Sequence, residues 1–224
     1  MGTFFLLYAT VFTLTTCSTT TPTNGVTEAK SSNATVKKSD LSGKRSSVFA
    51  SGCFWCVEAI FESVEGVEEA VSGYAGGSAE SANYQQVSAG RTKHAEAVEV
   101  FYDPEVVSYE TLLEVFFGSH DPTTLNQQGP DRGTQYRSTI FYKNEEEKIA
   151  AENFIAQLKK DEVFDGPITT TLESLDTFYD AEAYHLIYEV RNPYHPYGRG
   201  VSVPRLNRFK STYPHLLKKG NQSH

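Results

Sequence analysis

Cysteine is scarce in this chain, with three residues among 224. Three cysteines cannot form the dense disulfide framework of a small secreted domain, so a hydrophobic core has to hold the fold together. The 39% hydrophobic content supplies enough apolar material for one sizeable core, or for two small ones. Wholesale disorder is excluded, because 13 Tyr and 14 Phe need burial or a binding role.

Basic charge is also in deficit, with 20 Lys and Arg against 28 Asp and Glu and a net charge of −8. Residues 1–17 carry no charge and residues 18–45 carry five basic and two acidic groups, so residues 46–224 hold −11. Such a balance argues against nucleic acid as a partner, because a polyphosphate requires a basic face. The chain also lacks a dinucleotide fingerprint, a phosphate loop and a nucleophile-elbow motif, which disfavours nucleotide binding and serine hydrolysis.

The first 45 residues differ in composition from the rest of the chain. No apolar run reaches the roughly 20 residues of a membrane-spanning helix, and the uncharged stretch 4–14 has the length of a signal-peptide core. Residues 14–17 resemble a bacterial lipoprotein cleavage site, in which Cys17 would become the lipidated first residue. The alternative is a leader with a chance cysteine. We expect residues 1–17 to be an export leader, with Cys17 as a lipidation candidate that anchors the protein in the envelope or periplasm.

Residues 18–45 hold eleven Ser or Thr and few large apolar side chains, which predicts a flexible linker. Residues 46–224 show two periodicities of apolar residues, one typical of strands and one typical of helices. We expect these residues to form the catalytic domain. Alternation predicts strands at 47–51, 67–74, 95–102, 139–142 and 168–175, and three-to-four spacing predicts helices at 53–64, 109–117, 144–159, 181–188 and 205–217. Ser108 and Asn144 are expected to cap two of these helices.

This order of elements predicts an α+β fold, a two-layer sandwich of helices on a mixed or antiparallel sheet, with a ferredoxin-like core and an irregular C-terminal tail.

The strongest local motif is Gly-Cys-Phe-Trp-Cys at residues 52–56. Cys53 falls at a predicted helix N-terminus, where unpaired N–H groups and the helix dipole stabilise a thiolate and so a nucleophile. Cys56 follows one helical turn later, and Glu58 is expected to face solvent. The pair alone leaves three interpretations open: a redox pair, half of a metal site, or two buried cysteines that pack as small hydrophobic residues. No histidine lies at a recognisable metal-ligand spacing from the pair.

Further unusual blocks follow the cysteine motif in a fixed order. They are Gly-Tyr-Ala-Gly-Gly at 73–77, the Gly-Arg-Thr-Lys-His-Ala-Glu block at 90–96, the Gly-, Gln- and Asp-rich block at 120–138, and residues 178–185. With these blocks, the chain from about Ser47 to Leu217 resembles peptide methionine sulfoxide reductase of the A class.

The resemblance implies reduction of methionine S-sulfoxide, free or in proteins, to methionine. It makes Cys53 the nucleophile that attacks the sulfoxide sulfur and Glu96 the general acid that protonates the leaving oxygen. A general acid near neutral pH needs a raised pKa, so Glu96 should be buried. The resemblance further assigns substrate-binding roles to Phe54, Trp55, Tyr84, Asp131 and Tyr136. The two aromatic residues would accept the substrate methyl group, the tyrosines would bind its oxygen, and the aspartate would orient the polar network.

Attack leaves Cys53 as a sulfenic acid, which a second thiol can condense to a disulfide. Many family members carry a recycling cysteine near the C-terminus after a tyrosine, where this chain has Tyr197 and Gly198. We therefore expect Cys56 to resolve the intermediate, and thioredoxin or a thioredoxin-like protein to reduce the disulfide. No cofactor, metal or nucleic acid is expected, and the catalytic domain is expected to be soluble and monomeric. The alternatives are a general C-x-x-C thiol–disulfide oxidoreductase and a tethered binding module.

Overall fold

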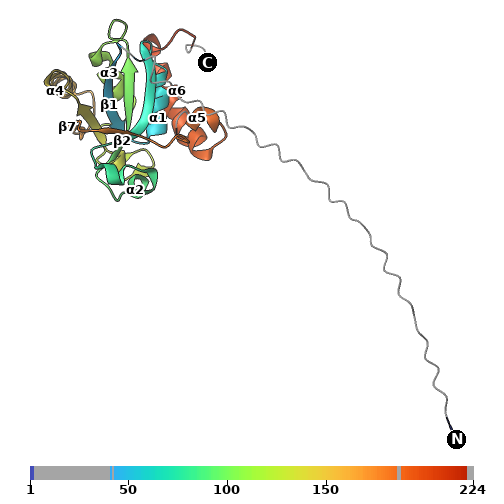
Figure 1. Cartoon of the computed structure of the whole chain (residues 1–224). Coiled ribbons are helices and arrows are strands. Elements are labelled where there is room, and N and C mark those ends of the chain that lie inside the picture. Colours follow the sequence, from blue (N-terminus) through green and yellow to red (C-terminus); the bar gives the residue numbers. More distant parts are fainter. Residues whose placement is uncertain (3–40, 42, 186–187, 221–224) are drawn as a thin grey trace. The chain divides into compact units, whose positions relative to one another are not determined.

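The computed structural model describes residues 1–2, 41, 43–185 and 188–220 (Figure 1). The expected leader, with Cys17, and most of the expected linker lie outside the described residues. The first strand begins at Arg45, and Lys44 donates a hydrogen bond of 2.7 Å to Asp103. The fold therefore includes the last residues of the segment that the sequence assigns to the linker. The domain division otherwise stays a prediction.

A six-stranded sheet lies at the centre of the folded unit, in the order β7-β6-β1-β3-β2-β8. The pairs are antiparallel except for β6 and β7, which run parallel. The strands are β1 (Arg45–Ser51), β2 (Val67–Ala75), β3 (Ala95–Tyr102), β6 (Ser138–Tyr142), β7 (Thr171–Ser174) and β8 (Phe178–Asp180), and a separate hairpin joins β4 (Gln127–Gln128) to β5 (Asp131–Arg132).

The described helices are α1 (Phe54–Glu62), α2 (Tyr84–Ser88), α3 (Tyr109–Gly118), α4 (Glu145–Lys160), α5 (Tyr188–Arg191) and α6 (Val203–Thr212). Two predicted caps are confirmed: Ser108 accepts a hydrogen bond from the Thr111 N–H group, and Asn144 accepts one from the Glu147 N–H group. Each satisfies a donor that the first helical turn leaves unpaired. No helix in the described part of the chain has the length and apolar character needed to cross a membrane.

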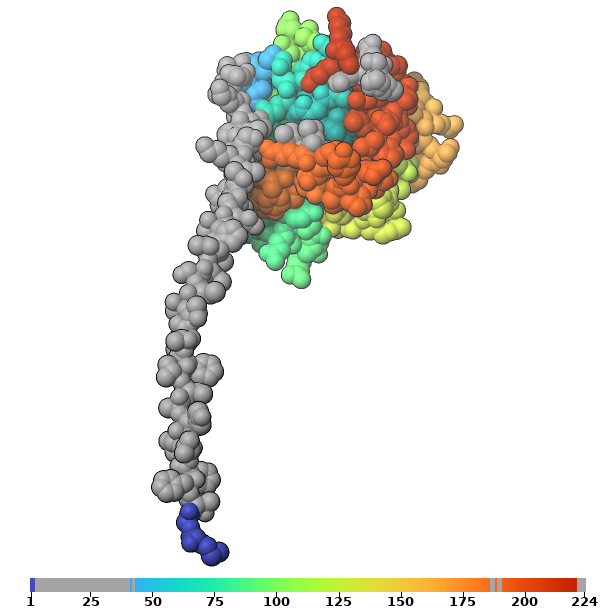
Figure 2. All heavy atoms as spheres, turned by 90° about the vertical axis from the view of Figure 1, so that its right-hand side faces the viewer, coloured from blue at the N-terminus to red at the C-terminus, as the bar shows by residue number. Residues whose placement is uncertain are grey.

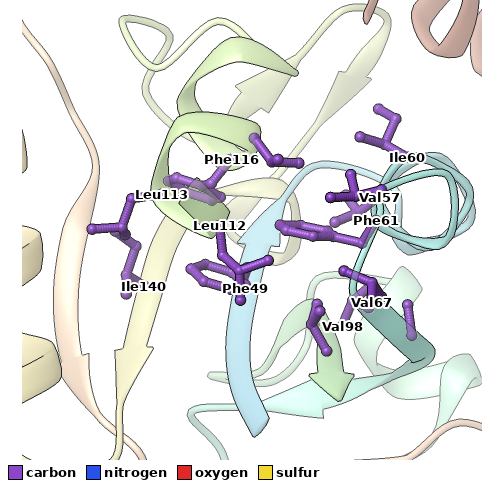
Figure 3. Packing of buried hydrophobic residues seen from close by; sticks show 14 of the residues in the cluster. Phe49, Val57, Ile60, Phe61, Val67, Val98, Leu112, Leu113, Phe116 and Ile140 are labelled. Carbon is purple, nitrogen blue, oxygen red and sulfur yellow. The ribbon is translucent and has the colours of Figure 1, made fainter. Parts of the chain in front are cut away.

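The main core lies between the sheet and helices α1 and α3 (Figure 3). The ring of Phe49 on β1 lies 5.2 Å from that of Phe61 on α1 and 5.4 Å from that of Phe116 on α3. Both helices therefore cover one face of the sheet. Because side chains alternate along a strand, Glu96 of β3 shares this face with the core residue Val98. Strand β3 thus directs the Glu96 carboxyl toward the start of α1.

The α+β class with a mixed, mainly antiparallel sheet is confirmed, whereas the ferredoxin-like core stays an interpretation. The helix predicted at 181–188 is wrong. Strand β8 pairs with β2 at 178–180, residues 183–185 form a turn, and α5 covers Tyr188–Arg191. A three-residue edge strand is too short to show an alternating pattern. The expected exposure of Glu58 is also wrong, because this side chain is buried and accepts a hydrogen bond from the Ser72 hydroxyl.

Candidate active site

The candidate site is built on the tight connection from β1 to α1. Cys53 is the N-cap residue of α1, as the sequence predicts. Gly52 before it has a φ of +94°, and a Cβ atom there would lie 2.6 Å from Cβ of Gln128. Only glycine adopts this conformation without strain and leaves the neighbouring hairpin in place. The connection therefore fixes the position of the Cys53 thiol.

Cys53 and Cys56 are free thiols in hydrogen-bond contact, and their side chains are 7% and 1% exposed. Burial, together with the hydrogen bond to Cys56, raises the pKa of Cys53. The hydrogen bond from Cys53 lowers the pKa of Cys56, and Arg205 and Ser202 add to this effect. The pKa values of the two thiols are thus shifted in opposite directions, which favours ionisation of Cys56 over that of Cys53. Burial thus opposes the effect of the helix N-terminus on the Cys53 thiol, and the Cys53 thiolate stays a prediction.

Glu96 faces the N-terminus of α1 from β3. Its side chain is 2% exposed, and its Oε2 accepts a hydrogen bond of 3.1 Å from the Phe54 N–H group. Burial raises the pKa of Glu96 to about 8, with a smaller contribution from the charge of Asp131. The carboxyl group is therefore mostly protonated at neutral pH and can donate a proton within the site.

Two phenols belong to the same electrostatic environment. Burial is the largest cause that raises the pKa of Tyr84, to about 12, and it also raises the pKa of Tyr136. The charges of Glu96 and Cys53 add to the shift in both residues. Tyr84 begins α2, and Tyr136 ends a short 3₁₀ turn before β6. Both remain neutral hydroxyl donors near the thiol and the carboxyl group.

Asp131 contacts a residue of the C-terminal tail. The Tyr197 hydroxyl donates to Oδ2 of Asp131 across 2.5 Å, and the same hydroxyl lies 4.0 Å from Sγ of Cys56. Burial raises the pKa of Asp131, while the Tyr197 hydrogen bond and the charge of Arg205 oppose this rise. Asp131 therefore orients Tyr197 beside the second thiol.

Phe54 and Trp55 anchor an aromatic cluster next to Cys53. The Trp55 ring stacks on Tyr188 with centroids 3.9 Å apart, and the buried Phe54 ring lies 6.3 Å from that of Tyr84. His185 lies between these rings, 5.2 Å from the Phe54 centroid and 5.6 Å from that of Trp55. Rings of this kind offer an apolar environment suited to a thioether or a methyl group.

A cavity of about 180 Å³ opens on the Cys56 side of the pair. Asp131, Tyr197 and Arg205 line it with Cys56. The sequence patterns do not single out Arg205, because arginine on a helix is usually exposed. Its spacing of four residues from the buried Phe209 is the signal that places both on the inner face of α6.

The site thus joins two thiols, a carboxyl group that holds its proton at neutral pH, and two neutral phenols. Two thiols in contact can supply two electrons by forming a disulfide, and the carboxyl group can protonate a leaving oxygen. In the part of the chain that the structure describes, no three His, Cys, Asp or Glu side chains gather as a metal site would require. This chemistry defines the class of cysteine-dependent reductases.

Comparison with known proteins identifies the family. The family model described as "Peptide methionine sulfoxide reductase" matches residues 45–216, and the chain belongs to this family. The chain is 47% identical over 171 residues to peptide methionine sulfoxide reductase MsrA of Chromobacterium violaceum, covering 76% of this chain and 97% of the relative. The MsrA of Acinetobacter baumannii is 50% identical over the same length, with the same coverage. The resemblance drawn from the sequence motifs is confirmed.

Solved structures agree with this assignment. Reduced Mxr1 from Saccharomyces cerevisiae superimposes with a TM-score of 0.64 and 33% identity, over 68% of this chain and 87% of Mxr1. Methionine sulfoxide reductase A of Corynebacterium diphtheriae gives a TM-score of 0.60 at 33% identity, over 69% of this chain and 78% of that protein. The general C-x-x-C oxidoreductase is not favoured by these matches.

Proposed function

We propose that this protein reduces methionine S-sulfoxide, free or in oxidised proteins, to methionine and so repairs oxidative damage. The observation that carries the proposal is the placement of Cys53 beside the protonated, buried Glu96 at the start of α1, in a chain of this family. Thiol and acid are the two groups that oxygen transfer from sulfoxide to cysteine requires.

The first half-reaction consumes the sulfoxide. Cys53 passes its proton to the Cys56 thiolate, with which it is in hydrogen-bond contact, and its sulfur attacks the sulfoxide sulfur. Glu96 gives its proton to the sulfoxide oxygen, which Tyr84 and Tyr136 hold by hydrogen bonds. The S–O bond of the substrate then breaks, the oxygen binds to the Cys53 sulfur, and the transient bond between the Cys53 and methionine sulfurs breaks with its electron pair going to methionine. Methionine leaves, and Cys53 becomes a sulfenic acid.

The second half-reaction removes the oxygen as water. The Cys56 sulfur attacks the Cys53 sulfenic sulfur, the new S–S bond replaces the S–O bond, and the proton of Cys56 reaches the departing oxygen through the Glu96 carboxylate. The two thiols thus provide the two electrons that reduce the sulfoxide. Thioredoxin or a thioredoxin-like dithiol protein then reduces the disulfide by thiol–disulfide exchange.

Steady-state assays with a dithiol reductant test this proposal. The wild-type chain should release methionine from the S epimer and not from the R epimer. Cys53→Ser should abolish the reaction, because a hydroxyl group is a much weaker nucleophile. Cys56→Ser should still form methionine in a single turnover while losing disulfide formation. Equal rates with both epimers, or an active Cys53→Ser variant, would contradict the proposal.

We also infer an exported, monomeric enzyme that Cys17 anchors to a membrane through lipid. The support comes from the sequence: an uncharged apolar leader, a lipobox-like cysteine and a polar linker of 28 residues. Expression in a bacterial host with a radiolabelled fatty acid tests the anchor. The wild-type chain should take up label in the membrane fraction, and Cys17→Ser should not. Label in both chains, or in neither, would contradict this inference.

A further inference from the structure

Arg205 is a buried cation whose position neither the nucleophilic attack nor the general acid explains. Its side chain belongs to α6 and is 6% exposed. Nε donates to the Ser119 carbonyl across 2.7 Å, and Nη2 donates to Oγ of Ser51 across 3.3 Å. These contacts tie the guanidinium to the end of α3 and the end of β1, directly beside the cysteine motif.

A buried charge requires compensation, because its removal from water is costly. Among the described residues, no Asp or Glu forms an ion pair with Arg205, and the Ser119 carbonyl and the Ser51 hydroxyl that accept its hydrogen bonds are neutral. The cysteine pair lies next to this cation: Arg205 and Cys56 line the same 180 Å³ cavity, and the charge of Arg205 favours the ionised form of Cys56. Ser202, one turn before Arg205 on the same tail, lies 3.0 Å from Sγ of Cys56 through its Oγ atom.

We propose that Arg205 is the counter-ion that holds the single negative charge of the cysteine pair on Cys56. This inference rests on the proposed function. Arg205 thereby acts as a positioning residue for both half-reactions. It keeps a proton acceptor beside Cys53 before attack, and it stabilises the thiolate that later attacks the Cys53 sulfenic sulfur. That attack forms the S–S bond and releases the oxygen as water.

The other ionisable groups around the pair do not take over this role. Glu96 holds its proton, and Asp131 is engaged by the Tyr197 hydroxyl. Burial, followed by the charge of Arg205, lowers the pKa of His120 to about 3, so this residue adds no positive charge. Tyr197 stays neutral, because burial raises its pKa.

The test is site-resolved alkylation of the full chain by iodoacetamide across pH, with each cysteine followed by peptide mass spectrometry. In the wild type, the midpoint for Cys56 should lie below that for Cys53. Arg205→Met should raise the Cys56 midpoint by about one unit or more, a tenfold loss of thiolate at neutral pH, in line with the effect of a close opposite charge. Arg205→Lys should keep most of the wild-type midpoint.

Arg208→Met is the matched control, because Arg208 lines the same cavity from the next turn of α6 but is exposed. It should leave the Cys56 midpoint unchanged. In a single turnover with the S epimer, Arg205→Met should accumulate the Cys53 sulfenic acid, trapped by dimedone. An unmoved Cys56 midpoint in Arg205→Met would overturn the proposal. Failure of the wild type to release methionine would instead contradict the proposed function and leave the alkylation result valid.

If Arg205→Met does not fold, Cys56→Ser tests the ion pair from the other side. It leaves the buried guanidinium without an anion, so the melting temperature of Cys56→Ser should fall further than that of Cys53→Ser at neutral pH. Equal melting temperatures for the two serine variants would overturn the assignment of Arg205 as the counter-ion.

Discussion

At the scale of single residues, burial decides the chemistry of the site. Cys53 and Glu96 both have raised pKa values because the core surrounds them, so both hold protons in the resting enzyme. The pKa of Cys56 is shifted the other way, because the hydrogen bond from Cys53 and the charge of Arg205 lower it. The N-cap and first turn of α1 therefore hold two thiols whose pKa values are shifted in opposite directions, and Arg205 of the tail contributes to the difference.

Replacement of Glu96 by Gln should lower the single-turnover rate of methionine formation by about 100-fold or more, since the proton donor is lost. The pH profile supplies a second readout. A general acid works only while protonated, and the pKa of Glu96 is raised to about 8. The wild-type rate should therefore fall as pH rises through about 8, and the Glu96→Gln variant should lack this decline.

Glu99→Gln is the matched control for that experiment. Glu99 is on the same strand, but its carboxylate pairs with Lys143 at 2.9 Å and accepts a hydrogen bond from Ser46 instead of facing α1. This variant should keep the wild-type pH profile. If both variants lose the alkaline decline, Glu96 is not the group that titrates.

Three residues show what the sequence alone can and cannot predict. The burial of Glu96 follows from its assigned role, and the structure has it buried. Glu58 looks like a solvated helix residue, yet it is buried against Ser72, because β2 covers a face that the helical pattern alone leaves open. Arg205 resembles any surface arginine until its tertiary partners are known. Long-range packing, which no local pattern encodes, decides each of these cases.

At the scale of elements, the β1–α1 connection places the thiol pair, and Gly52 is its most constrained residue. Gly52→Ala should lower the free energy of unfolding by about 2–4 kcal/mol, from backbone strain at positive φ and overlap with Gln128. Urea denaturation measures this loss. Gly129→Ala is the control, because its φ is also positive, at +56°, but no atom lies within 4 Å of the added Cβ. It should cost only about 1 kcal/mol, and equal losses would refute the role of the overlap.

Helix α4 provides a prediction remote from the site. Asn144 caps it through the Glu147 N–H group at 2.9 Å. Asn144→Ala should lower the free energy of unfolding by about 1 kcal/mol, the usual cost of a lost cap. The rate of methionine formation at 25 °C should stay at the wild-type value. A lower rate in the fully folded variant would show that α4 is coupled to the site.

The long, regular elements were predictable because their patterns are local. Strand β3 has the bounds that the alternation gives, 95–102, and the cap residues mark the starts of α3 and α4. The region 178–191 was not predictable in this way, because its short edge strand and one-turn helix are fixed by contacts with β2 and α1. This is the region that supplies His185 and Tyr188 to the aromatic cluster.

At the scale of the whole molecule, the C-terminal tail completes the site. Figures 1 and 2 show the orange and red segments, with α5 and α6, against the side of the domain that carries α1. Tyr197, Ser202 and Arg205 reach the thiol pair from this tail. Tyr197, Ser202 and Arg205 of the tail thus lie where the proposed electrostatic control of Cys56 requires them.

The central claim is that Cys53 takes the oxygen and Cys56 resolves the product as a disulfide. Intact mass spectrometry tests it directly: the fully reduced chain is given methionine S-sulfoxide without reductant, and the R epimer serves as the control. The account predicts release of methionine with loss of two hydrogens from the protein, for the S epimer only. A stable gain of one oxygen would contradict resolution by Cys56, and an unchanged mass with both epimers would contradict the account as a whole.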